Sequence, residues 1–160
     1  MSWQERIDAV WAGADDLTND EMVEAIDALV AERPATDAVA LFEAAGARDH
    51  AGREAEAEPL YRRALQVGLP EPQRAQAVIQ LASTLRNLGQ AEQSAALLEA
   101  ELREHPEHDL ADAARAFLAL AQHDTGRHTD ALQLALRALA AHLPQYGRAV
   151  SAYASELGAP

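Results

Sequence analysis

Apolar residues recur along this chain at offsets of three and four, which is the spacing of one face of an α-helix. Near the start of the chain the pattern is carried by Trp3, Ile7, Val10 and Trp11. Thr18 and Glu21 have the spacing of a capping box and predict the start of a second helix, which Pro34 ends. No clear alternation typical of strands appears. The pattern therefore predicts an all-α protein that begins with a helical hairpin over residues 1–34.

After this hairpin the pattern becomes a repeat. Gly52, Gly89 and Gly126 are separated by 37 residues each, and the same residue types lie at the same offsets from them. Leucine lies eight and thirteen residues after each glycine, at Leu60, Leu97 and Leu134 and at Leu65, Leu102 and Leu139. A repeat of this length indicates stacked supersecondary units rather than a single-core enzyme fold.

Each repeat is predicted to hold a first helix, a glycine turn and a second helix. The first helices are expected over 37–50, 73–87 and 109–125, and the second over 54–67, 91–104 and 128–142. The repeats span 36–70, 73–107 and 109–144, and a capping helix over 145–157 covers the apolar flank of the last one. The hairpin over 1–34 caps the other end. No low-complexity linker divides the chain, so one domain over 1–160 is expected, with a slight bend at Pro59.

Residues around the turn glycines resemble the tetratricopeptide-repeat family. In that family small residues lie five and twelve positions after the glycine and a bulky one lies nine after, as Ala57, Ala64 and Tyr61 do here. Glu101 and Ala135 depart from this pattern, and the repeat is longer than the usual 34 residues.

The resemblance implies a right-handed superhelix of antiparallel helix pairs that acts as a non-catalytic protein-interaction scaffold. The block 81–89, preceded by residues 61–65, looks like a group of short stand-alone bacterial repeat proteins.

Composition narrows the possible partners. The formal net charge is −13, and all thirteen basic residues are arginine. An acidic surface repels phosphates, so neither nucleic acid nor an anionic membrane is expected as a partner. The chain has no cysteine, and no stretch approaches the roughly 18–20 apolar residues of a membrane span. We therefore expect a cytoplasmic protein, and the lysine-free, alanine-rich composition suggests a GC-rich bacterial genome.

The first helices of such arrays line a concave surface, and this groove is the expected site for an extended peptide or a partner helix. Its predicted residues are Phe42, Asp49, His50, Ile79, Gln80, Ser83, Arg86, Asn87, Phe117, Leu120, His123 and Asp124; Glu43 and Gly46 share the same helix face as Phe42. Alternatives stay open for three of them. Arg86 either contacts a ligand or pairs with Asp49 or Asp124, Asn87 either faces the groove or caps its own helix, and Phe117 either anchors a ligand or belongs to the core.

The best-known ligand site of the resembling family is a clamp for carboxylates, built with lysine and asparagine in the groove. Here the corresponding positions hold Phe42, Gly46, Gln80, Ala113 and Phe117. This departure means that the clamp is not expected.

Metal binding and catalysis find little support in the sequence. His105, Glu107, His108 and Asp109 have metal-ligand side chains, but they lie in a proline-containing loop, so a solvated loop without metal is the preferred interpretation. No nucleophile elbow, phosphate-binding glycine loop or cysteine occurs, and neither an enzyme nor a cofactor is expected.

The sequence thus predicts a module that binds a protein or peptide. The alternative is a structural module that forms a homodimer through its terminal helices, with Trp3 and Trp11 in the N-terminal hairpin or Tyr146 and Tyr153 in the C-terminal helix. A small-molecule sensor or an unrecognised enzyme is a weaker third hypothesis.

Overall fold

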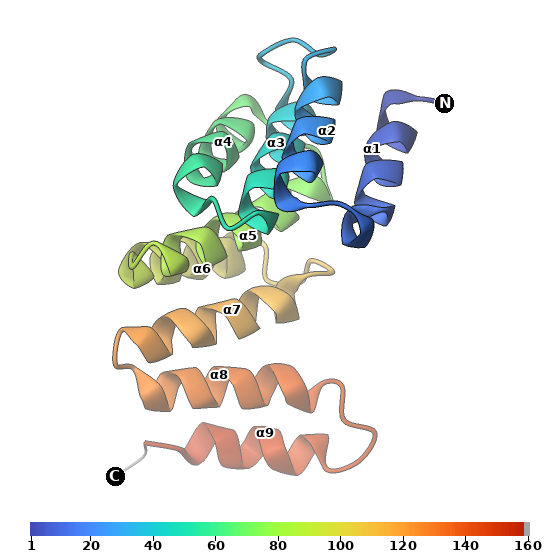
Figure 1. The fold of residues 1–160 in the computed structure, drawn as a ribbon. Helices are drawn as coiled ribbons and strands as arrows, with labels where there is room; N and C mark the ends of the chain where they lie inside the picture. Colours follow the sequence, from blue (N-terminus) through green and yellow to red (C-terminus); the bar gives the residue numbers. More distant parts are fainter. Residues whose placement is uncertain (159–160) are drawn as a thin grey trace. The chain divides into compact units, whose positions relative to one another are not determined.

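The structure is a computed structural model that describes residues 1–158. Within them the chain forms nine α-helices, one short 3₁₀-helix (Ala14–Asp16) and no strand, which confirms the all-α prediction. Figure 1 shows the helices in chain order. They are α1 (Trp3–Ala12), α2 (Asn19–Val30), α3 (Ala38–His50), α4 (Glu54–Val67), α5 (Gln73–Asn87), α6 (Ala91–Glu104), α7 (Ala111–Asp124), α8 (His128–Ala140) and α9 (Gly147–Glu156). None of the helices in residues 1–158 is long and apolar enough to cross a membrane.

The chain divides into two compact units, and the division falls inside α5. The first covers Met1–Thr84 and the second begins at Leu85. The N-terminal unit therefore holds the hairpin and the first repeat, and the C-terminal unit holds the helices from α6 onward. The single domain expected over 1–160 stays a prediction.

The 37-residue period is visible in the backbone hydrogen bonds. Gly52, Gly89 and Gly126 have φ of 70°, 76° and 82°, a left-handed conformation that glycine adopts without steric cost. The residue after each glycine donates its N–H to the carbonyl five residues earlier, as Arg53 to Arg48, Gln90 to Leu85 and Arg127 to Gln122, at 2.8–2.9 Å. These are Schellman bonds, and they end the first helix of each repeat in the same way.

The predicted helix boundaries hold closely in the two earlier repeats, and α4 runs through Pro59 without interruption. In the third repeat α7 begins at Ala111 rather than at 109, because the N–H of Ala111 closes a turn on the carbonyl of His108. In the same repeat α8 ends at Ala140 rather than at 142. The last helix covers Gly147–Glu156 rather than 145–157, and it begins after Tyr146, which has a left-handed conformation with φ of 66°.

In the N-terminal unit the hairpin packs against the first repeat. Both of its helices start with the capping boxes that their sequences encode, at Ser2 and at Thr18. Its core consists of Ile7, Met22, Val23 and Ile26 together with Ala47 of α3. Arg48 of α3 also donates two hydrogen bonds of 2.9 Å to the carboxylate of Asp27 on α2. The hairpin is thereby joined to α3 by both apolar and charged contacts.

In the C-terminal unit α7, α8 and α9 lie side by side, each antiparallel to the next (Figure 1). Small buried side chains allow the helices to approach, as Ala119 on α7 and Ala131 and Ala138 on α8 do. Arg137 of α8 donates to the hydroxyl of Ser155 on α9 at 2.9 Å. The last helix thus covers a flank of α8, as expected for a capping helix.

Candidate functional site

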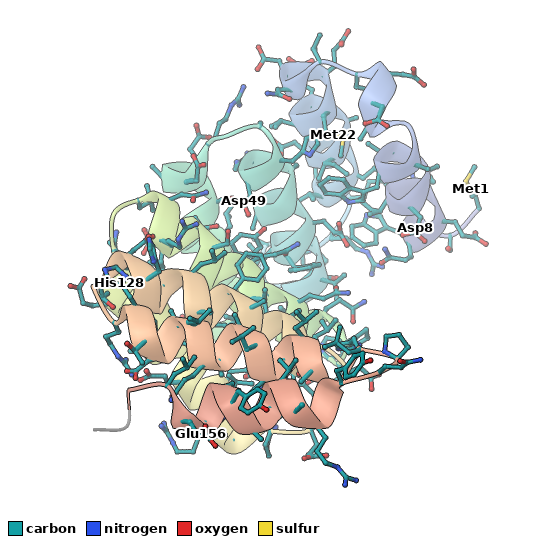
Figure 2. The ribbon with its side chains drawn as sticks, turned by 90° about the horizontal axis from the view of Figure 1, so that it is seen from below. Met1, Asp8, Met22, Asp49, His128 and Glu156 are labelled. Carbon is teal, nitrogen blue, oxygen red and sulfur yellow. The ribbon has the colours of Figure 1, made fainter. Side chains whose placement is uncertain are left out.

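A pocket of about 610 Å³ lies in the N-terminal unit. The helices that line it are α1, α3, α4 and α5. The lining residues are Trp11, Phe42, Glu43, Gly46, Asp49, His50, Tyr61, Gln76 and Gln80. Figure 2 labels Asp49 among the side chains of this unit. The hairpin, the first repeat and the first helix of the second repeat thus form the pocket together.

Helix α3 supplies the floor of the pocket. Glu43, Gly46 and Asp49 are spaced three residues apart, so successive members lie about one turn from each other. A Cβ at position 46 would lie 3.3 Å from the Cζ2 atom of Trp11 and 3.9 Å from the hydroxyl of Tyr61. Because residue 46 is glycine, the ring of Trp11 can pack closely against α3 at this turn.

Aromatic rings form the walls. Phe42 and Tyr61 lie with their ring centroids 6.2 Å apart, and Trp11 meets His50 edge to face at 6.0 Å. Tyr61 is fully buried, whereas Trp11 is half-buried and His50 is exposed. These distances are in the range of favourable aromatic pairs, so the walls hold one another in place.

Glu43 is an acid in a buried position, with 7% of its surface exposed. The indole N–H of Trp11 donates to its Oε2 at 2.7 Å. Burial raises the pKa of Glu43, hydrogen bonds from Trp11 and Gln4 oppose this shift, and the nearby charge of Asp8 adds to it. Glu43 is therefore held by neutral donors in a place that disfavours its charge.

Asp49 is half-buried and is also held by neutral donors. The hydroxyl of Tyr61 donates to its Oδ2 at 3.3 Å, and the hydroxyl of Thr84 lies 3.2 Å from its Oδ1. Thr84 has one hydroxyl hydrogen, and the carbonyl of Gln80 competes for it at 2.9 Å. Burial raises the pKa of Asp49, the hydrogen bonds from Thr84 and Tyr61 lower it, and the charge of Glu54 raises it. Burial beside Asp49 likewise raises the pKa of Tyr61, which keeps its phenol protonated and able to donate.

The polar groups of the pocket are mainly acceptors. Within residues 1–158 neither Glu43 nor Asp49 forms an ion pair, and the amide oxygen of Gln80 is buried without a hydrogen-bond partner. The nearest arginine on α3 is Arg48, whose guanidinium is engaged by Asp27. The pocket therefore combines aromatic walls with unsatisfied acceptors and two carboxylates.

Comparison with known proteins identifies the repeat. The family model described as "Tetratrico peptide repeat" matches residues 38–157, which is most of the chain. The chain belongs to the tetratricopeptide-repeat family. Neither the curated proteins nor the solved structures gave a significant match. Tetratricopeptide repeats generally mediate protein–protein interaction and are typically non-catalytic scaffolds.

In the N-terminal unit the structure gathers part of the predicted groove of the tetratricopeptide repeats. Phe42, Asp49, His50 and Gln80 all line the pocket. Ile79 is buried, and Ser83 is half-buried on α5 outside the pocket lining.

The other predicted residues belong to the C-terminal unit. Arg86 Nε lies 2.6 Å from Asp124 Oδ2, which is one of the two ion pairs considered for this arginine. Phe117 is half-buried, and Leu120 is 46% exposed on α7. His123 Nδ1 lies 3.1 Å from Nδ1 of His128, and Asn87 is exposed at the end of α5. Whether any of them contacts a ligand stays a prediction.

Sequence reasoning missed Trp11 and Tyr61 as lining residues. The sequence pattern places Trp11 in the predicted capping hairpin and gives Tyr61 only the bulky position of the repeat, nine residues after Gly52. Periodicity gives each helix its apolar face but does not reveal that α1 places its tryptophan over Glu43. The usable signal was the scarcity of aromatic residues, 4% of the chain, of which several meet at this pocket.

The histidine-rich loop before α7 makes local contacts. Nδ1 of His108 accepts from the N–H of Leu110 at 3.2 Å, and its Nε2 lies 3.5 Å from Glu101. Over the described part of the chain, no three histidine, aspartate or glutamate side chains converge as metal ligands would.

Proposed function

We propose that this chain is a non-catalytic binding module and that the pocket of its N-terminal unit anchors a side chain of a protein partner. The observation that carries the proposal is the pocket itself. Its volume of about 610 Å³ is within the range of ligand sites, and its walls are aromatic. Buried aromatic pockets are where binding energy concentrates in protein interfaces.

An extended peptide is the partner that fits best. Most of the pocket lining comes from α3 and α5, the first helices of two successive repeats, and repeats of this family generally mediate protein–protein interaction. Leu120 and the Arg86–Asp124 pair are proposed as further contacts in the C-terminal unit. We propose a cytoplasmic, bacterial setting, which rests on composition alone.

Peptide pools test this function. Ten-residue peptides with randomised flanks and one fixed central residue would be titrated while tryptophan emission is followed, since Trp11 lines the pocket. We expect at least one pool to change the emission of the wild type and to lose this effect in Gly46→Leu, whose side chain would enter the pocket between Trp11 and Tyr61. Ala55→Leu adds the same side chain at an exposed position of α4 and is the matched control.

Circular dichroism must first show that Gly46→Leu retains its helices. If no pool binds the wild type, or if every pool binds Gly46→Leu equally well, the pocket is not the peptide site.

Self-association through the C-terminal flank is a second candidate, favoured by a specific observation. Leu132 and Leu139 are about half exposed on α8 although they are leucines, and Tyr146 and Tyr153 are more exposed still. Self-association through the N-terminal hairpin has less support, because the indole N–H groups of Trp3 and Trp11 already donate to Leu29 and Glu43 within the same unit. Light scattering over a range of concentrations decides the matter, and a monomer at all concentrations would exclude this candidate.

A further inference from the structure

We propose that the pocket takes an arginine side chain of the partner, an inference that rests on the peptide-binding function proposed above. The juxtaposition that points to arginine is a pair of carboxylates on α3, Glu43 and Asp49, in a chamber walled by Trp11, Phe42 and Tyr61.

The unsatisfied acceptors of the pocket favour a ligand that donates hydrogen bonds. The carboxylate of Glu43 receives the indole N–H of Trp11 and a hydrogen bond from Gln4. The carboxylate of Asp49 receives one phenolic hydrogen and competes for another from Thr84. The buried amide oxygen of Gln80 receives none. A carboxylate can accept about four hydrogen bonds, so several acceptor sites remain. Burying another carboxylate here would leave them unsatisfied and add repulsion, so an anionic ligand is disfavoured.

The negative charge of the pocket favours a cationic ligand. Both acids are partly or wholly removed from water, and their hydrogen bonds come from neutral groups. Asp8 and Glu54 add further negative charge nearby, and the only titratable base in the lining is His50. A cationic ligand would be attracted by these charges, and the low local dielectric would strengthen the attraction.

The walls favour a guanidinium over an ammonium. A guanidinium is planar, stacks on aromatic rings and offers five donors in a fixed fork that matches carboxylates. It is also less strongly hydrated than an ammonium, so it loses less on entering a pocket walled by rings. Arginine is accordingly the basic side chain that uses both the aromatic and the acidic parts of this site.

The test uses the same ten-residue pools, with the central residue fixed as arginine, citrulline, glutamate or leucine. Citrulline keeps the size of arginine but has no charge. At 150 mM salt, where long-range attraction by the acidic surface is screened beyond about 8 Å, we expect the arginine pool to bind tenfold or more tightly than the citrulline pool. Glu43→Gln and Asp49→Asn should each weaken binding of the arginine pool by roughly tenfold while retaining the fold. Asp15→Asn removes an exposed charge outside the pocket and should leave binding unchanged.

The outcomes separate the two proposals. If the leucine or citrulline pool binds as tightly as the arginine pool and still depends on Gly46, the binding function stands and the arginine inference falls. If Asp15→Asn weakens binding as much as Glu43→Gln, the attraction is general and the inference falls as well. Free argininamide is titrated in the same way. If it binds as tightly as the arginine pool, the pocket is a site for a small cation, and the proposal of a peptide partner falls.

Discussion

The substitution Tyr61→Phe removes one hydroxyl from the wall of the pocket and tests how Asp49 is held. The ring of Tyr61 is fully buried and would stay in place, so the change isolates the hydrogen bond to Asp49 Oδ2. Hydrogen bonds to charged groups contribute about 1.5–3 kcal/mol, but the 3.3 Å separation is longer than the usual 2.5–3.0 Å of an O–H···O bond. We therefore expect a loss of about 1 kcal/mol in the free energy of unfolding.

Thermal unfolding followed by tryptophan fluorescence measures this loss, because Trp3 and Trp11 both lie in the N-terminal unit. A loss of 1 kcal/mol lowers Tm by about 2–4 °C if the whole chain unfolds at once and by about 4–8 °C if a unit of this size unfolds alone. Circular dichroism, which reports on both units, distinguishes the two cases. Tyr153→Phe, at a position 69% exposed on α9, is the matched control and should change stability by less than about 0.5 kcal/mol.

The effect of Tyr61→Phe should also depend on pH. The hydroxyl of Tyr61 stabilises the ionised form of Asp49, so its removal raises the pKa of Asp49 further. The destabilisation is then complete where Asp49 is ionised and shrinks as the pH falls through the pKa of this residue. A loss of stability that is the same at neutral and acid pH, or no loss at all, would refute the hydrogen bond to a carboxylate.

Three further predictions concern the same molecule. Burial raises the pKa of Glu43, so this carboxyl group binds a proton more tightly in the folded protein than in the unfolded chain. In urea unfolding at pH 7, Glu43→Gln should therefore be more stable than the wild type. This difference in stability should shrink as the pH falls through the raised pKa towards the usual 4.5. Ala131→Leu should overpack the crossing of α7 and α8 and cost about 1–3 kcal/mol, and an unchanged Tm would contradict the packing of Ala131. Gly126→Ala should cost about 1–2 kcal/mol because φ there is 82°, although a Cβ would meet no atom within 4 Å; a stabilised variant in thermal unfolding would show that the turn is not left-handed.

Much of the fold could be read from the sequence because its determinants are local. The capping box at Thr18 depends on residues three apart, and the left-handed turns depend on glycine at Gly52, Gly89 and Gly126. Each of these signals acts within one helix end, so the helix boundaries follow from the neighbouring residues. The start of α7, which the sequence pattern placed at 109 rather than at Ala111, lies in a loop whose turn at His108 has no equally strong local signal.

The candidate site was only partly predictable because it joins segments that are distant in the chain. The face of α3 that carries Phe42 and Asp49 follows from helical periodicity, and both residues line the pocket. That Trp11 lies against Glu43, 32 residues later, follows from how the hairpin packs on α3 through its apolar core and the Arg48–Asp27 pair. Such a contact depends on the combined shape of several helices, which no spacing encodes.

By itself, then, the sequence determined the helices, their turns and the 37-residue period, because short-range sterics and hydrogen bonds act between near neighbours. Only the tertiary structure decided that the acids of α3 are buried under aromatic rings, that neutral donors rather than arginines hold them, and that Arg86 pairs with Asp124. Burial and charge pairing are properties of the packed surroundings, and in this protein those surroundings come from other helices.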